Sequence, residues 1–553
     1  MGSRCGRVTL YLRIVISEPQ PARDPDERAG PSGISGRAVR GFAWAAVSFG
    51  GNKLLLFVST LVLTRLLAPA DFGVLAASVT VMAYLEVTLD LGMSAAIVYQ
   101  QQQGQPRSVS VAFTTNIGVC LILAALNVLF APTVATFFGV PDSVAIFRLL
   151  SVYIVVRGVG ALQTALLQRD LRFREKGVAD LARAIIRGGL GVILALAGLR
   201  EWSLIWAFLF AEVAGTAVSW GFTRYRPRFA FDLTTAGPLL RFGAPLAALQ
   251  LLSEVAVNSD YIVVGHRLGS VALGLYTIAF RLPELLLSNA FWIFSSVAFP
   301  VFSNARRAGS AALRGSMLKA LRLITLFGFP VSAGLAMVAR DAVHVLFGAQ
   351  WSAASTSMAL ISLALGSSSV GYASGDIYKA AGRPATLLLI NTAGTVVALT
   401  GFVLAAPHGI EAVAAVHLGF NLIYAVVRLG LANRLIGTSA GDVLRAMGPA
   451  LTISAGAVLL ALPVRLLTAT GPSALLAIIV AGLVGGAIGL ALTGGGTVRE
   501  LRGLFGELGR RRDRQPASRS VFLPGGAHTH DGEGPPEPGQ THPGGDPESA
   551  DPG

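Results

Sequence analysis

Long apolar stretches follow one another along most of the chain, separated by short polar segments. As an α-helix, a run of about 20 apolar residues spans the hydrocarbon core of a bilayer. No segment between the runs is long enough to bury a core of its own. The pattern therefore predicts an all-α polytopic membrane protein with about fourteen transmembrane helices, at 41–64, 72–98, 109–131, 144–167, 177–199, 202–222, 242–265, 273–302, 318–339, 353–378, 384–406, 410–431, 443–463 and 472–493.

The two ends of the chain are polar. Residues 1–40 and 495–553 are rich in Pro, Gly and charged residues, which is typical of disordered tails. Within the second tail, the basic stretch 497–514 is either a short amphipathic helix on the inner membrane face or a solvated end. Both interpretations remain open.

Composition and charge sharpen this prediction. The chain has 53% hydrophobic and 13% charged residues, whereas a soluble domain has about 25% charged residues. We assign the segments between the helices alternately to the two sides of the membrane, starting with the N-terminal tail inside. The inner segments then hold most of the Lys and Arg residues. The outer loops hold only Arg65, Arg200, Arg267, Arg340 and Arg465. Such a bias indicates that both termini lie in the cytoplasm. The net charge of +14 is thus a topology signal, and no nucleic acid partner is expected.

Two loops repeat. "RLLAPADFGVL" (65–75) matches "HRLGSVALGLY" (266–276), so that Leu67 aligns with Leu268, Phe72 with Leu273 and Gly73 with Gly274. A second, weaker match pairs "APTVATFFG" (131–139) with "ARDAVHVLFG" (339–348). Each pair lies six helices apart.

Because six is an even number of helices, both halves of the chain would have the same orientation in the membrane. This is the arrangement of a parallel repeat, related by an axis along the membrane normal. The pattern therefore predicts an N-lobe at 41–222, a basic cytoplasmic linker at 223–241 and a C-lobe at 242–434. Two further helices follow within 435–494. Two lobes around a central cavity are typical of a transporter that works by alternating access.

Five charged residues of the first lobe fall at similar depths. At ~1.5 Å per residue, Lys53, Glu86, Arg157, Arg187 and Glu212 lie about 15–18 Å from the inner ends of their helices. One hypothesis is a cationic cavity wall that binds a diphosphate-linked lipid headgroup. The alternative is internal pairing, such as Lys53 with Glu86, that ties helices together. Both remain open.

The second lobe carries a similar set. Glu254, Asn258 and Asp260 lie on the helix at 242–265. Arg281 and Glu284 flank Pro283, which should disturb the next helix and free backbone carbonyls. Arg281 is a further candidate cation of the cavity, unless it forms a salt bridge to the preceding helix.

The carboxylates Glu86, Glu212, Glu254 and Asp260 are candidates for ion coupling or for internal pairing. Asp90 shares a helix face with Glu86, but we interpret it as a turn or cap residue near the inner end.

Motifs of several enzyme classes are missing. The chain has no GxxxxGK[ST] phosphate loop, no Cys/His cluster with zinc spacing and no GxSxG elbow. No external loop is long enough for a membrane glycosyltransferase or polymerase. We therefore expect a non-enzyme that holds no cofactor and no metal.

Several stretches resemble the polysaccharide-exporter branch of the multidrug/oligosaccharidyl-lipid/polysaccharide superfamily. They occur in the order "LTRLLAPADFGVLAAS" (63–78), "LDLGMSAAIVYQ" (89–100), "ALLQRDLRFRE" (165–175), "NSDYIVVGHRLGSVALGLYTIAFRLPE" (258–284) and "VSAGLAMVARDAVHVLFGAQW" (331–351). The resemblance covers about residues 38–435. It implies fourteen helices in two lobes and movement of an undecaprenyl-diphosphate-linked oligosaccharide, or a similar glycolipid, between the leaflets of a bacterial cytoplasmic membrane.

The resemblance also implies coupling to an ion gradient or to the membrane potential. Membrane lipids, and the polymerase and glycosyltransferases of the same pathway, would be partners. The alternatives are a multidrug or organic-cation exporter of the same superfamily, a peptidoglycan-precursor flippase, and a polytopic glycosyltransferase or polymerase.

Overall fold

A computed structural model describes residues 50–90, 106–170, 172–223, 226, 229–230, 232–494 and 497. The expected tails, the inner end of the run 72–98 and most of the stretch 497–514 lie outside these ranges. All regular elements of the described ranges are helices. After a first helix at 50–66 come α3 (Pro69–Asp90), α5 (Pro106–Phe137), α6 (Val144–Arg169), α7 (Phe173–Leu196), α8 (Glu201–Phe222), α9 (Leu233–Pro283), α10 (Asn289–Arg307), α11 (Ser310–Ala342), α12 (Ser355–Ala380), α13 (Pro384–Ala405), α14 (Ile410–Ile436), α15 (Ala440–Leu467) and α16 (Pro472–Leu492).

The apolar runs coincide with these helices. Eleven segments of the described chain are long and apolar enough to cross a membrane, and one of them, Gln250–Arg307, covers two predicted runs. α7 is not among them, because Asp180, Arg183 and Arg187 interrupt its apolar part. The all-α membrane class is confirmed, and the count of fourteen spans stays a prediction.

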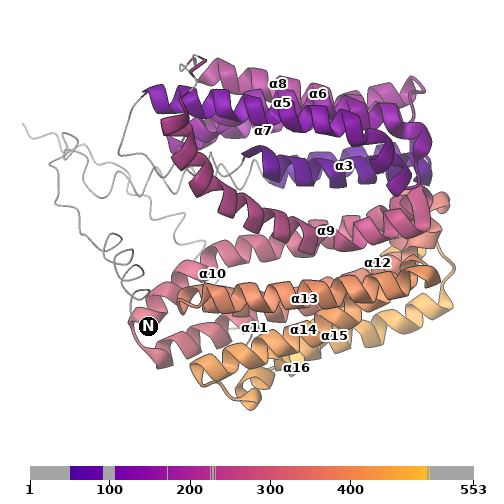
Figure 1. The fold of residues 1–553 in the computed structure, drawn as a ribbon. Helices are drawn as coiled ribbons and strands as arrows, with labels where there is room; N and C mark the ends of the chain where they lie inside the picture. Colours follow the sequence, from indigo (N-terminus) through magenta and orange to yellow (C-terminus); the bar gives the residue numbers. More distant parts are fainter. Residues whose placement is uncertain are drawn as a thin grey trace, which may run out of the picture. The chain divides into compact units, whose positions relative to one another are not determined.

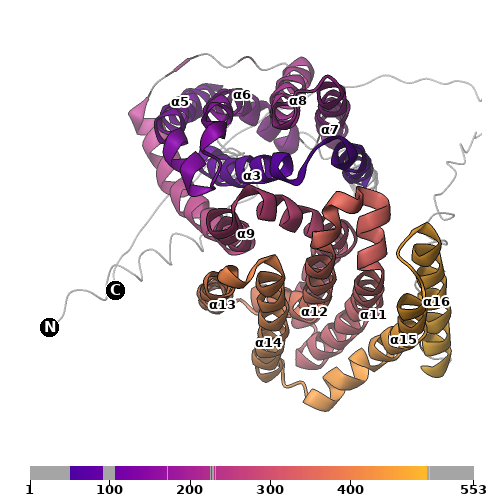
Figure 2. The same ribbon diagram turned by 90° about the vertical axis from the view of Figure 1, so that its right-hand side faces the viewer.

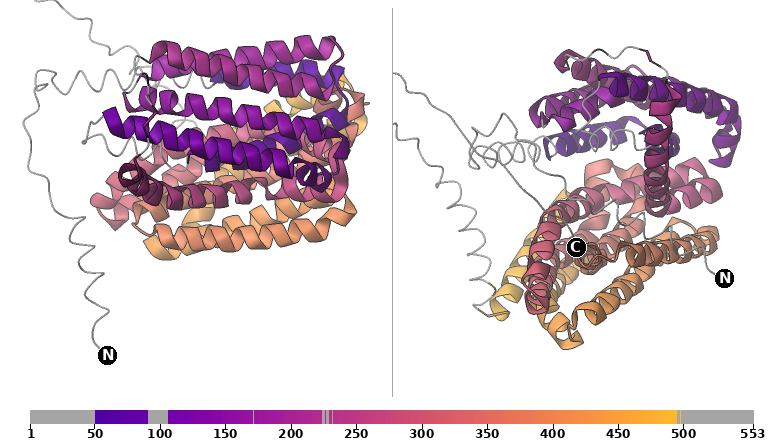
Figure 3. Two further views of the ribbon diagram at one scale, coloured as in Figure 1. Left: turned by 45° about the horizontal axis from the view of Figure 1, so that its top comes forward. Right: turned by 60° about the vertical axis from the view of Figure 1, so that its left-hand side comes forward.

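Most helices run roughly parallel, as expected of a membrane bundle (Figures 1 and 3). Seen end-on, α3 and α5–α8 form one group and α11–α16 another, with α9 between them (Figure 2). α9 contains a break at Gly269, whose φ of 80° lies in the left-handed region. This break falls in the loop predicted between the runs 242–265 and 273–302.

The two repeated glycines face each other where α3 packs against α9. A Cβ on Gly73 would overlap the carbonyl oxygen of Ser270, and a Cβ on Gly274 would overlap that of Pro69. In the sequence repeat, Gly73 aligns with Gly274 and Pro69 with Ser270. Each repeat therefore contributes the same two positions to a reciprocal contact, which is how elements related by a two-fold axis meet.

The second, weaker repeat also has matching local structure. α5 is followed by Gly139 with φ 66° and the 3-10 turn η2 (Pro141–Ser143). α11 is followed by the π-turn η4 (Val343–Phe347), Gly348 with φ 115° and the 3-10 turn η5 (Ala349–Ala354). Both segments therefore end a long helix with a positive-φ glycine after a buried phenylalanine, Phe138 or Phe347.

These loops meet at one end of the bundle, which we call the Gly73 end. Trp351 Nε1 and Gln350 Nε2 donate to the carbonyl oxygen of Thr64 at 2.9 and 2.6 Å. The Phe72 ring packs edge-on against Trp351 at 5.1 Å. His266 stacks on Phe137 at 4.2 Å. The first half of the chain is thus bound to the second half at this end.

Pro283 disturbs its helix as predicted. The π-helical turn η3 (Glu284–Ser288) follows it directly. Asn289 Nδ2 donates to the carbonyl oxygens of Glu284 and Leu285 at 3.0 and 3.2 Å. The Asn289 side chain therefore adds hydrogen bonds to the carbonyl groups of the irregular turn.

Candidate functional site

Among the described residues, the most buried charged residue of the first half is Glu212 on α8. Arg157 Nη1 on α6 lies 3.1 Å from its Oε1, and Arg183 Nε on α7 lies 3.1 Å from its Oε2. Arg183 Nη1 also pairs with Asp180 at 2.9 Å. One carboxylate thus ties three helices together through charge-assisted hydrogen bonds.

Arg157 continues this chain toward α3. Its Nε lies 3.8 Å from Glu86 Oε1, and the hydroxyl of Tyr153 donates to the same oxygen. Positive and negative side chains therefore alternate along α7, α8, α6 and α3.

Glu86 and Arg157 open onto a polar cavity of about 360 Å³ between α3, α6 and α9. Glu254 of α9 lines the same cavity, together with Gln168 and Gln250. We call it the α3–α6–α9 cavity. Glu254 is held in place, because its Oε2 accepts a hydrogen bond from Asn258 Nδ2 at 2.9 Å. Three of the charged residues selected from the sequence thus line one space, with one guanidinium among two carboxylates.

The other candidate cations lie elsewhere. Lys53 lies 3.8 Å from Glu284 and does not pair with Glu86, the partner suggested above. Arg187 lies over the ring of Phe208, with 3.7 Å from Cζ to the ring centroid. The buried Nε atoms of Arg187 and Arg281 have no hydrogen-bond partner within the described chain. The candidate arginines therefore differ in their pairing. Arg157 forms ion pairs, whereas Arg187 and Arg281 form none with any described residue.

Asp260 belongs to a second buried group, in the other half. Its Oδ2 accepts a hydrogen bond from Tyr276 at 3.0 Å and lies 3.5 Å from His417 Nδ1. The backbone N–H of Tyr261 donates to Oδ1. His417 stacks on Phe402, with ring centroids 5.6 Å apart. Asp260 and His417 thus lie within ion-pair distance, although Nδ1 forms no hydrogen bond within the described chain.

Sequence analysis missed Arg183 and His417. Arg183 lies three residues after Asp180 and four before Arg187, so helical spacing placed it on the same face. His417 comes from α14, and no sequence signal linked it to Asp260. The side chain of Asp90 lies outside the described part of the structure. Over the described ranges, no cluster of three metal-ligating side chains occurs.

Comparison with known proteins identifies relatives. A family model for polysaccharide biosynthesis proteins matches residues 62–356. The succinoglycan biosynthesis transport protein ExoT of Rhizobium meliloti (strain 1021) is 28% identical over 59% of this chain and 66% of its own length. The chain thus spans just under two thirds of the length of the curated relatives it matches.

Two solved structures share the fold. The lipid II flippase MurJ in an inward closed conformation aligns with a TM-score of 0.68 at 14% identity, over 81% of this chain and 98% of MurJ. An inward-facing multidrug resistance MATE transporter of the MOP superfamily aligns with a TM-score of 0.56 at 15% identity, over 71% of this chain and 98% of its own. At these identities, the similarity to the two structures is evidence for the fold alone. Because the family model covers more than half of the sequence, the chain belongs to the family of polysaccharide biosynthesis proteins.

Proposed function

We propose that this protein translocates a lipid-linked oligosaccharide from the inner to the outer leaflet of a bacterial cytoplasmic membrane, for the synthesis of a cell-surface polysaccharide. The substrate would be an undecaprenyl-diphosphate-linked repeat unit or a related glycolipid. The observation that carries the proposal is the α3–α6–α9 cavity in a member of this family. There Glu86 and Arg157 of the first half of the chain share a polar space with Glu254 of the second.

The architecture behind this proposal is fourteen spans with both termini inside. Lobes at 41–222 and 242–434 are joined by the linker 223–241 and followed by two helices within 435–494, with cytoplasmic tails at 1–40 and 495–553. The reciprocal contact of Gly73 and Gly274 supports a two-fold relation between the lobes. With this topology the Gly73 end faces outward. Its contacts support a conformation closed to the outside, from which rocking would expose the substrate to the outer leaflet.

Within this mechanism, Lys53, Arg157, Arg187 and Arg281 would contact the anionic headgroup. Arg187 and Arg281 suit this role best, because no ion pair within the described chain neutralises them. Arg157 lines the α3–α6–α9 cavity, and its two carboxylate partners would hold the guanidinium in position for this contact. Glu86, Glu212, Glu254 and Asp260 would take part in ion coupling, and Asp260 lies 3.5 Å from a second ionisable group, His417.

A second candidate function is export of organic cations. Glu86 and Glu254 favour it, because two carboxylates face one guanidinium in the cavity. The chain's membership of a family of polysaccharide biosynthesis proteins argues against this second function.

One experiment separates the two functions. A strain lacking the protein should accumulate sugar-loaded carrier lipid on the inner leaflet, and wild-type protein should relieve the accumulation. We expect that Arg187→Gln and Arg157→Ala do not relieve the lipid accumulation. Arg148→Gln, on the exposed side of α6, should relieve it as the wild type does. All variants should insert normally, as checked by membrane fractionation. Normal export by Arg187→Gln would remove the cationic site from the mechanism. Loss of organic-cation efflux without lipid accumulation would instead support the second function.

A further inference from the structure

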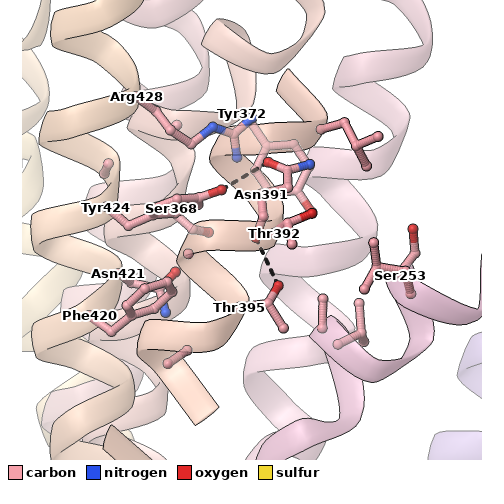
Figure 4. A pocket seen from close by; sticks show the side chains of 18 of the residues that line it. Ser253, Ser368, Tyr372, Asn391, Thr392, Thr395, Phe420, Asn421, Tyr424 and Arg428 are labelled. Atoms are coloured by element: carbon pink, nitrogen blue, oxygen red, sulfur yellow. Dashed lines mark hydrogen bonds between the residues drawn. The ribbon is translucent and has the colours of Figure 1, made fainter. Parts of the chain in front are cut away.

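A second pocket, mostly apolar, lies in the other half of the chain. On α9 its lining residues Leu252 and Ser253 neighbour Gln250 and Glu254 of the α3–α6–α9 cavity. The second pocket has a volume of about 510 Å³ and is enclosed by α9, α12, α13 and α14 (Figure 4). This is within the range of small-molecule sites. Among the described residues that line it, Arg428 of α14 is the only charged one. We call it the Arg428 pocket.

Arg428 has no anionic partner among the residues that the structure describes. Its Nε is buried without a hydrogen bond, and no described carboxylate lies within ion-pair distance of its guanidinium. Its nearest charge-related contact is the ring of Tyr424, 5.3 Å from Cζ. A Cβ on Gly375 would lie 2.5 Å from Nη2, so the glycine leaves room for the guanidinium. An uncompensated cation at membrane depth is costly, and a bound anion would remove that cost.

The rest of the pocket suits a neutral polar group beside that anion. In Figure 4, Arg428 points toward Tyr372 and the amide of Asn391. The hydroxyl of Tyr424 donates to Asn391 Oδ1 at 2.8 Å, which orients this amide so that its N–H groups stay available. Asn421 and the ring of Phe420 complete the wall. Amide N–H groups beside one cation can donate to further oxygens of a bound phosphate.

An apolar groove adjoins the pocket. It runs between α13 and α14, has a volume of about 760 Å³, and shares Gly394, Phe420 and Tyr424 with the pocket. Its wall includes Val397 and Ile423, which are 63% and 68% exposed and would face lipid. α15 and α16 pack on α11 and leave this side uncovered.

Two glycines of α13 line the groove. A Cβ on Gly401 would lie 2.8 Å from Val416 Cγ1, and one on Gly394 would lie 2.6 Å from the Tyr424 ring. Because these two glycines lack side chains, Val416 and the Tyr424 ring can pack directly against α13, and all four residues line the groove.

We propose that the groove and the Arg428 pocket together bind a polyprenyl phosphate lipid, with the single hydrocarbon chain between α13 and α14 and the terminal phosphate at Arg428. One continuous apolar groove that ends at one unpaired cation fits one chain that ends in a phosphate. A phospholipid, by contrast, carries two acyl chains and an internal phosphate. With the proposed topology, Arg428 lies about 12 Å from the inner end of α14, on the side from which the lipid would load. This inference rests on the proposed function and names a binding site for the carrier lipid of its substrate.

The test measures binding of undecaprenyl phosphate to the purified full-length protein in detergent by native mass spectrometry. We expect Arg428→Gln to weaken binding by about tenfold or more, because a charge-assisted contact to phosphate is lost. Arg428→Lys should restore part of it. Gly419→Leu should weaken binding by filling the groove, because Gly419 lines the groove and a Cβ there meets nothing within 4 Å. Arg383→Gln, an exposed arginine on the loop before α13, is the matched control and should bind as the wild type does.

Two further ligands distinguish the contribution of the phosphate from that of the hydrocarbon chain. Undecaprenol, which lacks the phosphate, should bind wild type and Arg428→Gln equally. Phosphatidylglycerol should compete poorly. Equal affinity of Arg428→Gln and wild type for undecaprenyl phosphate, or equal competition by phosphatidylglycerol, would overturn the inference. If these variants still relieve the lipid accumulation described above, the proposed function stands and only this site falls. If wild type neither binds the lipid nor relieves accumulation, the proposed function fails as well.

Discussion

At the scale of single residues, most charges within the helices of the first half are compensated by neighbours. Glu212 is shared by Arg157 and Arg183, and Arg157 also approaches Glu86. A lone charge at mid-bilayer costs about 2.5–3.5 kcal/mol on insertion scales, so alternation lowers the cost of each member. Arg187 and Arg428 depart from this pattern, which is why both are assigned to binding.

Replacing Glu212 by Gln should destabilise the protein strongly. The substitution leaves Arg157 and Arg183 buried beside a neutral amide, and breaking a buried pair in this way costs about 3–5 kcal/mol. We expect the melting temperature of the purified protein to fall well below that of Glu201→Gln. Glu201 is the matched control because it lies on the same helix, where it is partly exposed and 3.8 Å from Arg200. Equal melting temperatures for the two variants would show that the buried network contributes nothing to stability.

Depth along the helices was enough to select Glu86, Arg157, Glu212 and Glu254 from the sequence. All four lie in or beside the α3–α6–α9 cavity. Partners could not be selected in the same way, because depth says nothing about the direction in which a side chain points. Lys53 therefore pairs with Glu284 and not with Glu86.

The Arg428 pocket escaped prediction for a related reason. Its walls come from four helices, and the residue that orients toward Arg428, Asn391, is contributed by α13. Neither the sequence of α13 nor that of α14 alone indicates that Asn391 and Arg428 belong to one site.

At the scale of elements, hydropathy was sufficient to locate the helices but not their ends. α9 begins at Leu233, well before the predicted 242, because Asp232 accepts a hydrogen bond from the N–H of Thr234 and caps the helix at a polar position. The break at Gly269 was predictable, since a glycine follows the apolar run there. The π-turn after Pro283 was predictable only as a disturbance.

The reciprocal glycine contact should be intolerant of a single methyl group. Gly73→Ala would push a Cβ against the backbone carbonyl of Ser270, which cannot rotate away. We expect a loss of about 1–3 kcal/mol, as for overpacked cores, and the same for Gly274→Ala. Gly118→Ala on α5, where a Cβ meets nothing within 4 Å, should leave the melting temperature unchanged or slightly higher. Tolerance of both Gly73→Ala and Gly274→Ala would mean that α3 and α9 do not approach this closely in the membrane.

At the scale of the whole molecule, the contacts between the two halves concentrate at the Gly73 end. Trp351 and Gln350 hold Thr64, His266 stacks on Phe137, and Gly73 meets Ser270. Most of these groups come from the loops that the sequence repeat identified. In an alternating-access cycle this end must separate, so the same loops would act as the outer gate.

Cross-linking the Gly73 end should stop transport without unfolding the protein. In a background with Cys5→Ser and Cys120→Ala, the pair Phe137→Cys and His266→Cys joins positions whose rings stack at 4.2 Å. Bridging by oxidation or a short bis-thiol reagent should reduce relief of lipid accumulation to the level of the strain without the protein, and reductant should restore it after oxidation. The control pair Ala461→Cys and Gly482→Cys joins α15 to α16, where a Cβ at 482 would lie 3.9 Å from that of Ala461, a separation suited to a disulfide. That bridge does not connect the two halves, so export should continue. Undiminished export by the fully bridged Phe137–His266 pair would mean that the halves do not separate at this end, and the rocking mechanism would have to be replaced.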